Sequence, residues 1–329
     1  MIVGLEEKKE NILAARFGGL GDLLITLPSI QLMKKKRPQI QITLVARQSY
    51  GLFLKEAEVI EALLPLEAHE ASLLFQAGEE IPDQGFLNYD LVLIWLNKES
   101  AEMEAIWRRR FGEKLRLIAG PGEANRPLAR YFLLKTAEIF NIQINRSSEE
   151  KEYALLPLKE EWLEEAQGHF PWLKDIPYVV LHPGSGRLIK RWKLENFLSL
   201  IDFFVEKRIG GIVITGPAEE SYLTVLSAFR WPDHWGWTHE PALKVVCGLL
   251  YGALLYIGND SGITHLAASC SCSGLAFFRQ ENFPVWSPWS DRIKIIVAPE
   301  LESIEIDSVV EKIQELLASK KDGFQKNKD

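Results

Sequence analysis

One stretch constrains the fold of this 329-residue chain more than any other, the segment 256–268 with the sequence YIGNDSGITHLAA. It begins at the end of an apolar run (245–257), breaks into a polar turn, and continues with small apolar residues that suit a packed helix. This pattern predicts a strand, a turn and a helix. In open α/β sheets, ligands bind where strand ends meet helix starts, and the free main-chain N–H groups there suit phosphate. Asp260, Ser261 and His265 are therefore either capping and packing residues or ligand contacts.

Strand and helix patterns alternate along the rest of the chain. We expect strands at 11–16, 41–46, 90–95, 115–119, 178–182, 211–215, 274–278 and 293–297, and helices at 23–36, 49–64, 128–140, 195–207 and 306–317. Such alternation predicts parallel sheets in doubly wound α/β domains.

A polar segment at 145–161 reads as a linker and divides this series in two. We therefore expect an α/β protein with two Rossmann-like domains that face one another, residues 1–160 and 161–329. The sequence leaves open whether the last helix packs back on the first domain. A disordered tail is expected after it.

The composition is that of an ordinary globular protein, with 47% hydrophobic and 25% charged residues. A net charge of −7 argues against nucleic acid as a partner. Basic residues gather at 34–37 and 108–110, and each cluster is either a solvated face or a surface for an anionic partner.

Three cysteines, Cys247, Cys270 and Cys272, cannot all pair, and their apolar surroundings predict buried free thiols in a reducing compartment. Residues 1–10 are mostly charged and carry no signal-peptide pattern. The run 245–257 is shorter than the roughly 20 residues that cross a bilayer. These features predict a cytoplasmic protein, with peripheral membrane contact left open.

The first glycine-rich loop allows two interpretations. Gly18, Gly19 and Gly21 follow a strand, and Arg47 ends the next one, as in a site for NADP. However, the spacing is not G-x-G-x-x-G, and the Asp22 carboxylate competes with a bound phosphate for the helix start. Asp22 is then either a helix N-cap or a base that accepts a proton from a hydroxyl nucleophile. The glycines would let a bulky acceptor approach the backbone.

A second glycine loop, 182–186 (HPGSG), precedes two cations, Lys190 and Arg191. Main-chain N–H groups and adjacent cations make a plausible diphosphate site. Trp192 is expected in the core. Glu219 either caps a helix or binds vicinal hydroxyl groups such as those of ribose.

No D-x-D pair and no cluster with metal-ligand spacing occurs in the sequence, so no metal or other cofactor is expected. A leaving diphosphate would instead be neutralised by Lys190, Arg191 and the helix start after Asp260.

Four segments follow one another along nearly the whole chain: 17–28 (FGGLGDLLITLP), 182–186 with Lys190 and Trp192, 215–219 (TGPAE) and 258–265 (GNDSGITH). In this order they resemble glycosyltransferase family 9, the ADP-heptose:lipopolysaccharide heptosyltransferases. The resemblance implies a GT-B fold with an N-terminal acceptor domain and a C-terminal nucleotide-sugar domain. It also implies an inverting, metal-independent transfer of heptose from ADP-heptose to a lipid-linked lipopolysaccharide core.

The same resemblance implies site residues. Asp22 would be the general base, beside the acceptor-side glycines Gly18, Gly19 and Gly21. The implied donor-binding residues are Gly184, Ser185, Lys190, Thr215, Glu219, Asp260, Ser261, Gly262 and His265. Two segments, 231–241 and 269–273, depart from the family pattern. Two further readings stay open, a transferase that uses another nucleotide sugar and a non-catalytic protein that kept the fold.

Overall fold

The structure, a computed structural model, describes residues 9–76, 88–121, 126–144 and 147–326. The chain divides into two compact units, unit 1 (Met1–Pro157) and unit 2 (Leu158–Asp329). The sequence predicts a division after residue 160, within the same polar segment. The N-terminal segment 1–10, in which no signal peptide was predicted, lies outside the described residues as far as residue 8.

Unit 1 is built on a five-stranded sheet in the order β3-β2-β1-β4-β5, and its pairings are parallel. The strands are β1 (Glu10–Arg16), β2 (Ile40–Ala46), β3 (Ala62–Pro65), β4 (Leu91–Leu96) and β5 (Leu115–Ala119). The central strands β1 and β4 are almost wholly buried, as expected for a sheet covered on both faces.

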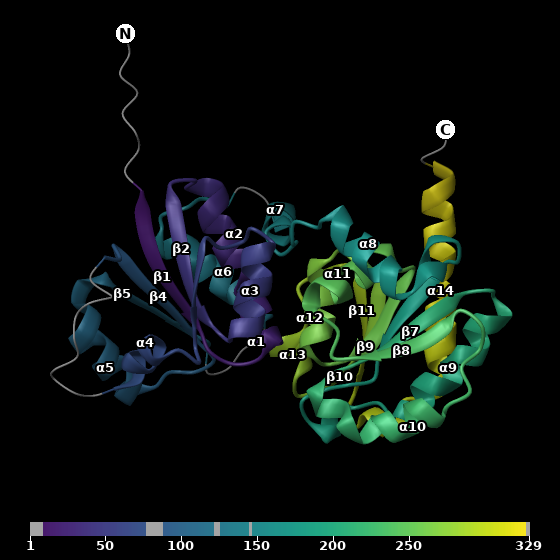
Figure 1. The fold of residues 1–329 in the computed structure, drawn as a ribbon. Helices are drawn as coiled ribbons and strands as arrows, with labels where there is room; N and C mark the ends of the chain where they lie inside the picture. Colours follow the sequence, from purple (N-terminus) through teal and green to yellow (C-terminus); the bar gives the residue numbers. More distant parts are fainter. Residues whose placement is uncertain (1–8, 77–87, 122–125, 145–146, 327–329) are drawn as a thin grey trace, which may run out of the picture. The chain divides into compact units, whose positions relative to one another are not determined.

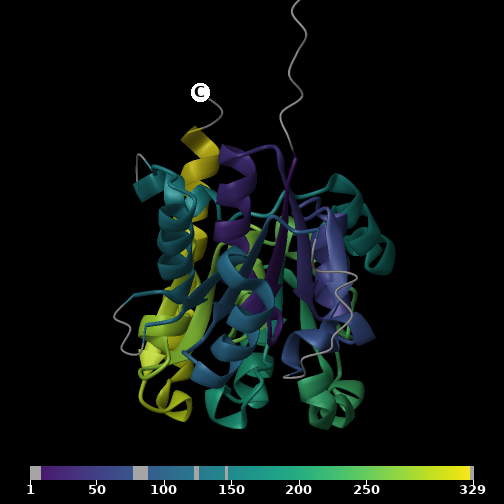
Figure 2. The ribbon, with the colours of Figure 1, turned by 90° about the vertical axis from the view of Figure 1, so that its left-hand side faces the viewer.

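Helices cover both faces of this sheet (Figure 1; Figure 2 gives the view after a quarter turn). They are α1 (Leu20–Leu24), α2 (Leu27–Lys36), α3 (Gln48–Glu56), α4 (His69–Ser72), η1 (Leu73–Phe75), α5 (Ala101–Phe111), η2 (Gly112–Lys114), α6 (Leu128–Ile139) and α7 (Ser147–Glu152). On one face, Trp107 and Phe111 of α5 pack on Leu13, Val92 and Ile94 of the sheet. On the other face, α6 packs on Trp95, whose indole N–H lies 3.4 Å from the Thr136 hydroxyl.

Unit 2 repeats this plan with a six-stranded sheet in the order β11-β10-β9-β6-β7-β8, again with parallel pairings. The strands are β6 (Tyr178–His182), β7 (Gly210–Thr215), β8 (Trp235–His239), β9 (Leu255–Asn259), β10 (Gly274–Arg279) and β11 (Ile293–Ala298). Parallel pairing needs crossover helices, which the sequence between these strands provides.

The helices of unit 2 are α8 (Glu160–His169), η3 (Pro171–Lys174), η4 (Leu188–Lys190), α9 (Leu194–Glu206), η5 (Pro217–Tyr222), α10 (Leu223–Ala228), α11 (Leu243–Gly252), α12 (Gly262–Ser269), α13 (Phe283–Trp286), η6 (Leu301–Ser303) and α14 (Ile306–Lys326). The core contains Trp192, as predicted, together with Phe197 and Phe277, which form one aromatic cluster. Val309 and Ile313 of α14 pack in this same core, so the last helix is part of unit 2.

Two predicted elements of unit 1 are wrong in part. The helix expected at 23–36 is two helices, α1 and α2, and the Thr26 hydroxyl donates to the Leu23 carbonyl at the break between them. The helix expected at 49–64 ends at Glu56, and Glu58 has a positive φ of 58°. Residues 62–65 form the edge strand β3. The spacing of its apolar side chains does not distinguish it from one face of a helix.

The linker and tail predictions also need correction. The polar segment 145–161 holds α7 and the start of α8, although residues 145–146 lie outside the described part. The last helix extends to Lys326, past the expected end at 317. The disordered tail expected after residue 317 is therefore wrong up to residue 326, which is still helical, and residues 327–329 lie outside the described residues.

The cysteines are buried free thiols, as predicted, and the sulfur atoms of Cys247 and Cys270 lie 3.5 Å apart. The tryptophan-rich segment 231–241 forms strand β8 at the edge of the sheet. Its side chains Trp231, Trp235 and Trp237 pack in or against the core of unit 2. This explains its aromatic content by packing.

Candidate functional site

Each sheet has a position where the chain reverses its direction of strand addition. In unit 2 it lies between β6 and β9, and in unit 1 between β1 and β4. Ligands of open α/β sheets bind outside the carboxyl ends of the strands at such positions. The loops that follow these four strands carry most of the residues predicted from the sequence.

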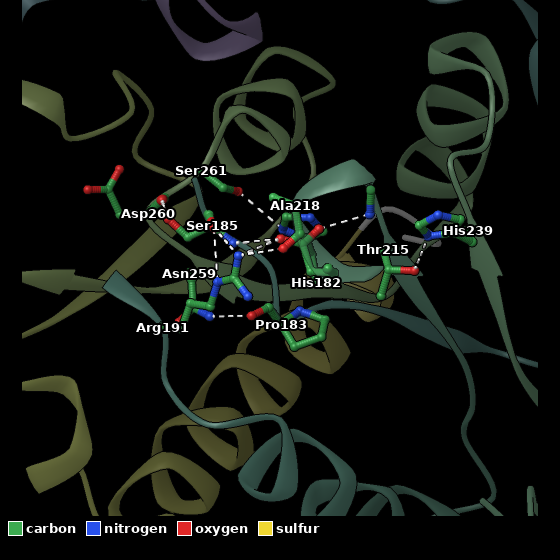
Figure 3. A network of polar contacts seen from close by, with 12 residues as sticks. His182, Pro183, Ser185, Arg191, Thr215, Ala218, His239, Asn259, Asp260 and Ser261 are labelled. Carbon is green, nitrogen blue, oxygen red and sulfur yellow. Dashed lines mark hydrogen bonds and ion pairs between the residues drawn. The ribbon is translucent and has the colours of Figure 1, made fainter. Parts of the chain in front are cut away.

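In unit 2, Asn259 joins the two loops at the switch point. Its amide donates to the Pro183 carbonyl over 2.8 Å and accepts from the Trp192 main-chain N–H over 2.9 Å. The Ser185 hydroxyl donates to the carbonyl of Asp260 over 2.7 Å. Figure 3 shows how these contacts gather the ends of β6 and β9. Asn259 is fully buried and lies in the predicted 258–265 motif, but its role as a bridge was not predicted.

The helix α12 starts directly after this junction. Ser261 is its N-cap, and its hydroxyl accepts from the Thr264 main-chain N–H over 3.4 Å. The capping interpretation of this turn is therefore right for Ser261, whereas Asp260 precedes the cap. The first N–H groups of a helix lack intrahelical acceptors, so the turn from Ser261 to Gly262 offers donors and a partial positive charge to an anion.

Lys190 brings a positive charge to the same place. Its ammonium group forms an ion pair with the Asp260 carboxylate at 2.7 Å, while 22% of the Lys190 side chain remains exposed. The cation and the start of α12 are thus held together by Asp260. This combination can bind a phosphate or diphosphate group.

Arg191 lies in a different environment, and its part in neutralising a diphosphate stays a prediction. Its guanidinium group is buried and donates to the Ser185 carbonyl (2.9 and 2.6 Å) and the Ala218 carbonyl (2.8 Å). In Figure 3 the Asp260 carboxylate points away from this group. The short turn of η4 gives these two neighbouring cations opposite environments.

Glu219 lies on the other side of Arg191. One carboxylate oxygen accepts from the Ser185 N–H (3.2 Å) and lies 3.3 Å from Arg191, and the other accepts from the Gly216 N–H (2.8 Å). Burial raises the pKa of Glu219, while these partners favour its charged form. The carboxylate therefore ties the loops after β6 and β7 together. A Cβ on Gly184 would overlap it, so this glycine makes room for Glu219.

Thr215 and His265, two other predicted donor residues, are buried. The Thr215 hydroxyl lies 3.1 Å from Nδ1 of His239, the residue directly opposite it in the β7–β8 strand pair. His265 lies in α12, one turn after Ser261. The contacts described above thus form one cluster, made of Ser185, Lys190, Glu219, Asp260 and Ser261. Thr215 lies beside it and contacts His239 of β8. Their contacts with a donor stay a prediction.

His182, which ends β6, contributes a neutral side chain to this cluster. Its Nδ1 lies 3.2 Å from the Ser261 hydroxyl. Burial, assisted by the charge of Arg191, lowers the pKa of His182 to about 3. The imidazole therefore remains neutral near neutral pH, and protonation would place an uncompensated charge in the core of the site.

This burial makes the stability of the protein depend on pH. The unfolded chain binds a proton at His182 below about pH 6.5, and the native state does not, so stability is complete above that pH and falls below it. The loss is about 2 kcal/mol between about pH 7.5 and about pH 5. Urea unfolding measures the free energy of unfolding at the two pH values. For His182→Gln the difference between them should be smaller than for the wild type by that amount. His169→Gln, at an exposed position of unit 2, should keep the wild-type difference. A His182→Gln protein with the wild-type pH dependence would contradict the assignment.

In unit 1, Asp22 lies in the loop and helix after β1. It occupies the third position of α1, and Gly19 is the N-cap, so the N-cap interpretation of Asp22 is wrong in detail. Its carboxylate accepts from the Gly19 N–H over 3.0 Å and pairs with Arg16 at 3.0 Å. A Cβ on Gly18, which has a φ of 124°, would overlap the carboxylate. Gly18, one of the glycines expected to admit an acceptor, therefore first makes room for Asp22.

Arg16 and Asn97 were not predicted as site residues. Arg16 ends β1 and is buried, and Asn97 follows β4. A lone charged residue at the end of a buried strand was the available signal for Arg16. The signal for Asn97 was its position directly after a strand. This position indicates a place near Asp22 only once β4 is known to pair with β1.

The basic clusters are largely paired within the chain. Lys34 lies 2.6 Å from Glu61, Arg37 donates to the Phe140 carbonyl, and Arg108 pairs with Glu104 at 2.7 Å. Within the described ranges, no group of three or more His, Cys, Asp or Glu residues could hold a metal ion. A search over the same part of the chain finds no helix long and apolar enough to span a membrane.

Known proteins resemble this chain in sequence and in fold. The model of glycosyltransferase family 9 (heptosyltransferase) matches residues 128–313. Lipopolysaccharide heptosyltransferase 3 of Escherichia coli is 22% identical over 297 residues, which cover 83% of this chain and 84% of that protein.

Solved structures extend the likeness to nearly the whole chain. A glycosyl transferase family 9 protein from Veillonella parvula aligns with a TM-score of 0.75 and 18% identity, covering 96% of this chain and 99% of that one. The E. coli ADP-heptose lipopolysaccharide heptosyltransferase II aligns with a TM-score of 0.72 and 18% identity, covering 94% and 99%.

Two Rossmann-like units with parallel sheets and these structural neighbours define a protein of the GT-B fold, which confirms the predicted fold class. The family model covers more than half of the chain. The protein belongs to glycosyltransferase family 9, the heptosyltransferase family, as the resemblance of its motifs indicated. This membership places it among glycosyltransferases and favours an acceptor-side role for the first glycine-rich loop over a site for NADP.

Proposed function

We propose that this glycosyltransferase moves heptose from ADP-heptose to a lipid-linked lipopolysaccharide core acceptor at the cytoplasmic face of the inner membrane. The observation that carries the proposal is the pairing of Lys190 with Asp260 at the start of α12, on the switch point of unit 2. A site that combines a cation with a helix start suits the diphosphate of a nucleotide sugar. The names of the family relatives supply the sugar and the acceptor.

The proposed reaction is a single displacement. The acceptor hydroxyl oxygen bonds to the anomeric carbon, the bond from that carbon to the diphosphate breaks, and its electron pair leaves with ADP. Asp22 takes the proton of the hydroxyl group as general base. Attack opposite the leaving group inverts the configuration. Lys190 and the N–H groups of α12 stabilise the charge of the departing diphosphate, and we propose that no metal is required.

Nucleotide binding measured by isothermal titration calorimetry tests the donor site. ADP should bind more tightly than UDP, GDP or NADP, and EDTA should leave its affinity unchanged. Lys190→Ala should weaken ADP binding about 10- to 100-fold, because a charge-assisted hydrogen bond to phosphate is lost and the Asp260 carboxylate is left facing the anion.

The matched control is Lys244→Ala, which also removes a lysine–carboxylate ion pair in unit 2, with Glu165 at 2.8 Å. It should leave ADP affinity unchanged. A preference for UDP would favour a GT-B transferase with another nucleotide sugar and remove the ADP-heptose assignment. If no nucleotide binds, the non-catalytic reading replaces the proposal.

A further inference from the structure

The carboxylate of Asp22 is held by donors from three separate segments. Oδ1 accepts from Nη2 of Arg16 (3.0 Å) and from the side-chain amide of Asn97 (3.1 Å), and Oδ2 accepts from the Gly19 N–H (3.0 Å). A single helix-capping contact would need only the last of these. The other two come from the ends of β1 and β4, the strands on each side of the switch point of unit 1.

Arg16 fixes both the side chain and the main chain of Asp22. Its Nε donates to the Asp22 carbonyl over 2.9 Å, and its Nη1 donates to the Trp95 carbonyl over 3.2 Å. The guanidinium group also lies over the Phe132 ring, 5.3 Å from its centroid. Burial lowers the pKa of Arg16 to about 10, and the charge of Asp22 opposes this change, so the group is still cationic at neutral pH.

Asn97 completes the arrangement. Its amide oxygen accepts from Nη2 of Arg16, while its amide nitrogen donates to Oδ1 of Asp22. The three side chains therefore form a closed triangle of hydrogen bonds. Each corner restrains the other two, which fixes the direction of the carboxylate more firmly than one ion pair would.

The two carboxylate oxygens of Asp22 differ in the number of hydrogen-bond positions that remain unfilled. Each can accept about two hydrogen bonds, so the contacts made by the described residues fill Oδ1 and leave one position on Oδ2. The Asp22 side chain is 24% exposed, whereas that of Arg16 is 1% exposed. The open position thus belongs to the exposed carboxylate and not to the buried cation.

We propose that Arg16 and Asn97 are positioning residues for the transfer reaction, and that Oδ2 of Asp22 is the atom that accepts the acceptor proton. This inference rests on the proposed function, in which Asp22 is the base. Holding Oδ1 fixes the direction of the free position on Oδ2, and a general base is effective only when it lies within hydrogen-bond reach of the proton. A displacement of about 1 Å can cost about 100-fold in rate.

The test compares kcat, KM for the donor, ADP affinity and melting temperature in full-length variants. Asn97→Ala should lower kcat about 10-fold or more, with ADP affinity changed by less than about twofold, because the donor site is built from unit 2. Arg16→Lys should retain more kcat than Arg16→Met, since the ammonium group keeps a charged contact with Oδ1. A purely structural role would lower the melting temperature without a change of kcat in the folded protein.

Arg130→Met is the matched control, because it also removes an arginine–carboxylate pair in unit 1, with Glu150 at 2.8 Å. It should leave kcat unchanged. If Asn97→Ala and both Arg16 variants keep wild-type kcat while Asp22→Asn does not, the positioning role is wrong and the proposed function stands. If the wild-type protein neither binds nucleotides nor transfers sugar, the proposed function itself fails.

Discussion

Replacing Asp22 by asparagine should lower kcat for sugar transfer about 100- to 10,000-fold, the range expected when a general base is lost. The amide is close in shape to the carboxylate but cannot take up the proton of the acceptor hydroxyl. Asp22 lies in unit 1, and the residues of the donor cluster lie in unit 2, so ADP affinity should change by less than about twofold. Transfer assays with saturating donor, together with calorimetry of ADP binding, measure both quantities.

Asp90→Asn is a matched control for this variant. Asp90 is another exposed carboxylate of unit 1 that accepts from a main-chain N–H, that of Asn11 at 2.8 Å, but it precedes β4 and lies at the opposite end of the sheet. This control should keep wild-type turnover. An Asp22→Asn protein that is folded and fully active would show that another group takes the proton, or that the proton leaves to water.

The strands that form the two sheets could be predicted because most of them are continuous apolar runs. Segments such as 178–182 and 211–215 are buried on both faces, so their sequences have no polar interruption. The edge strand β3 is different, since its four residues are only partly buried. Its identity is fixed by pairing with β2, which local sequence does not show.

The candidate site was predictable where one short segment carries the chemistry. Ser261 caps α12 within its own motif, and Lys190 follows the glycine loop 182–186 by four residues. Asp22 was found in the same way. Asn97, which helps to hold it, was missed because it is 75 positions away and reaches Asp22 only through the pairing of β1 with β4. Arg16 is six positions away, but a single cation at the end of a strand did not indicate its contact with Asp22.

Lys190 and Arg191 show a further limit. They are adjacent cations in a loop, where no helical or strand period indicates which side chain points outward. The structure leaves Lys190 partly exposed beside Asp260 and buries Arg191 among carbonyl groups. Equal roles for the two were a reasonable expectation, and only the tertiary contacts separate them.

Arg191 is also a position in unit 2 where a single change should cost much stability. Its guanidinium group joins the Ser185 and Ala218 carbonyls, lies 3.3 Å from the Glu219 carboxylate, and stacks 5.3 Å from the Tyr222 ring centroid. Arg191→Met leaves the buried Glu219 charge without its cation and two carbonyls without a donor. We expect the free energy of unfolding to fall by about 3–5 kcal/mol, the range for breaking one side of a buried ion pair.

Urea unfolding of the full chain, followed by tryptophan fluorescence, measures this loss. Arg230→Met, at an exposed position of the same unit, should change stability by less than about 0.5 kcal/mol. Adding Glu219→Gln to Arg191→Met removes the uncompensated charge, so the double variant should be more stable than the sum of the two single losses, with a coupling energy of about 0.5–3 kcal/mol. Strict additivity would mean that the two side chains are stabilised independently, and Arg191 would then be a packing residue whose charge is incidental.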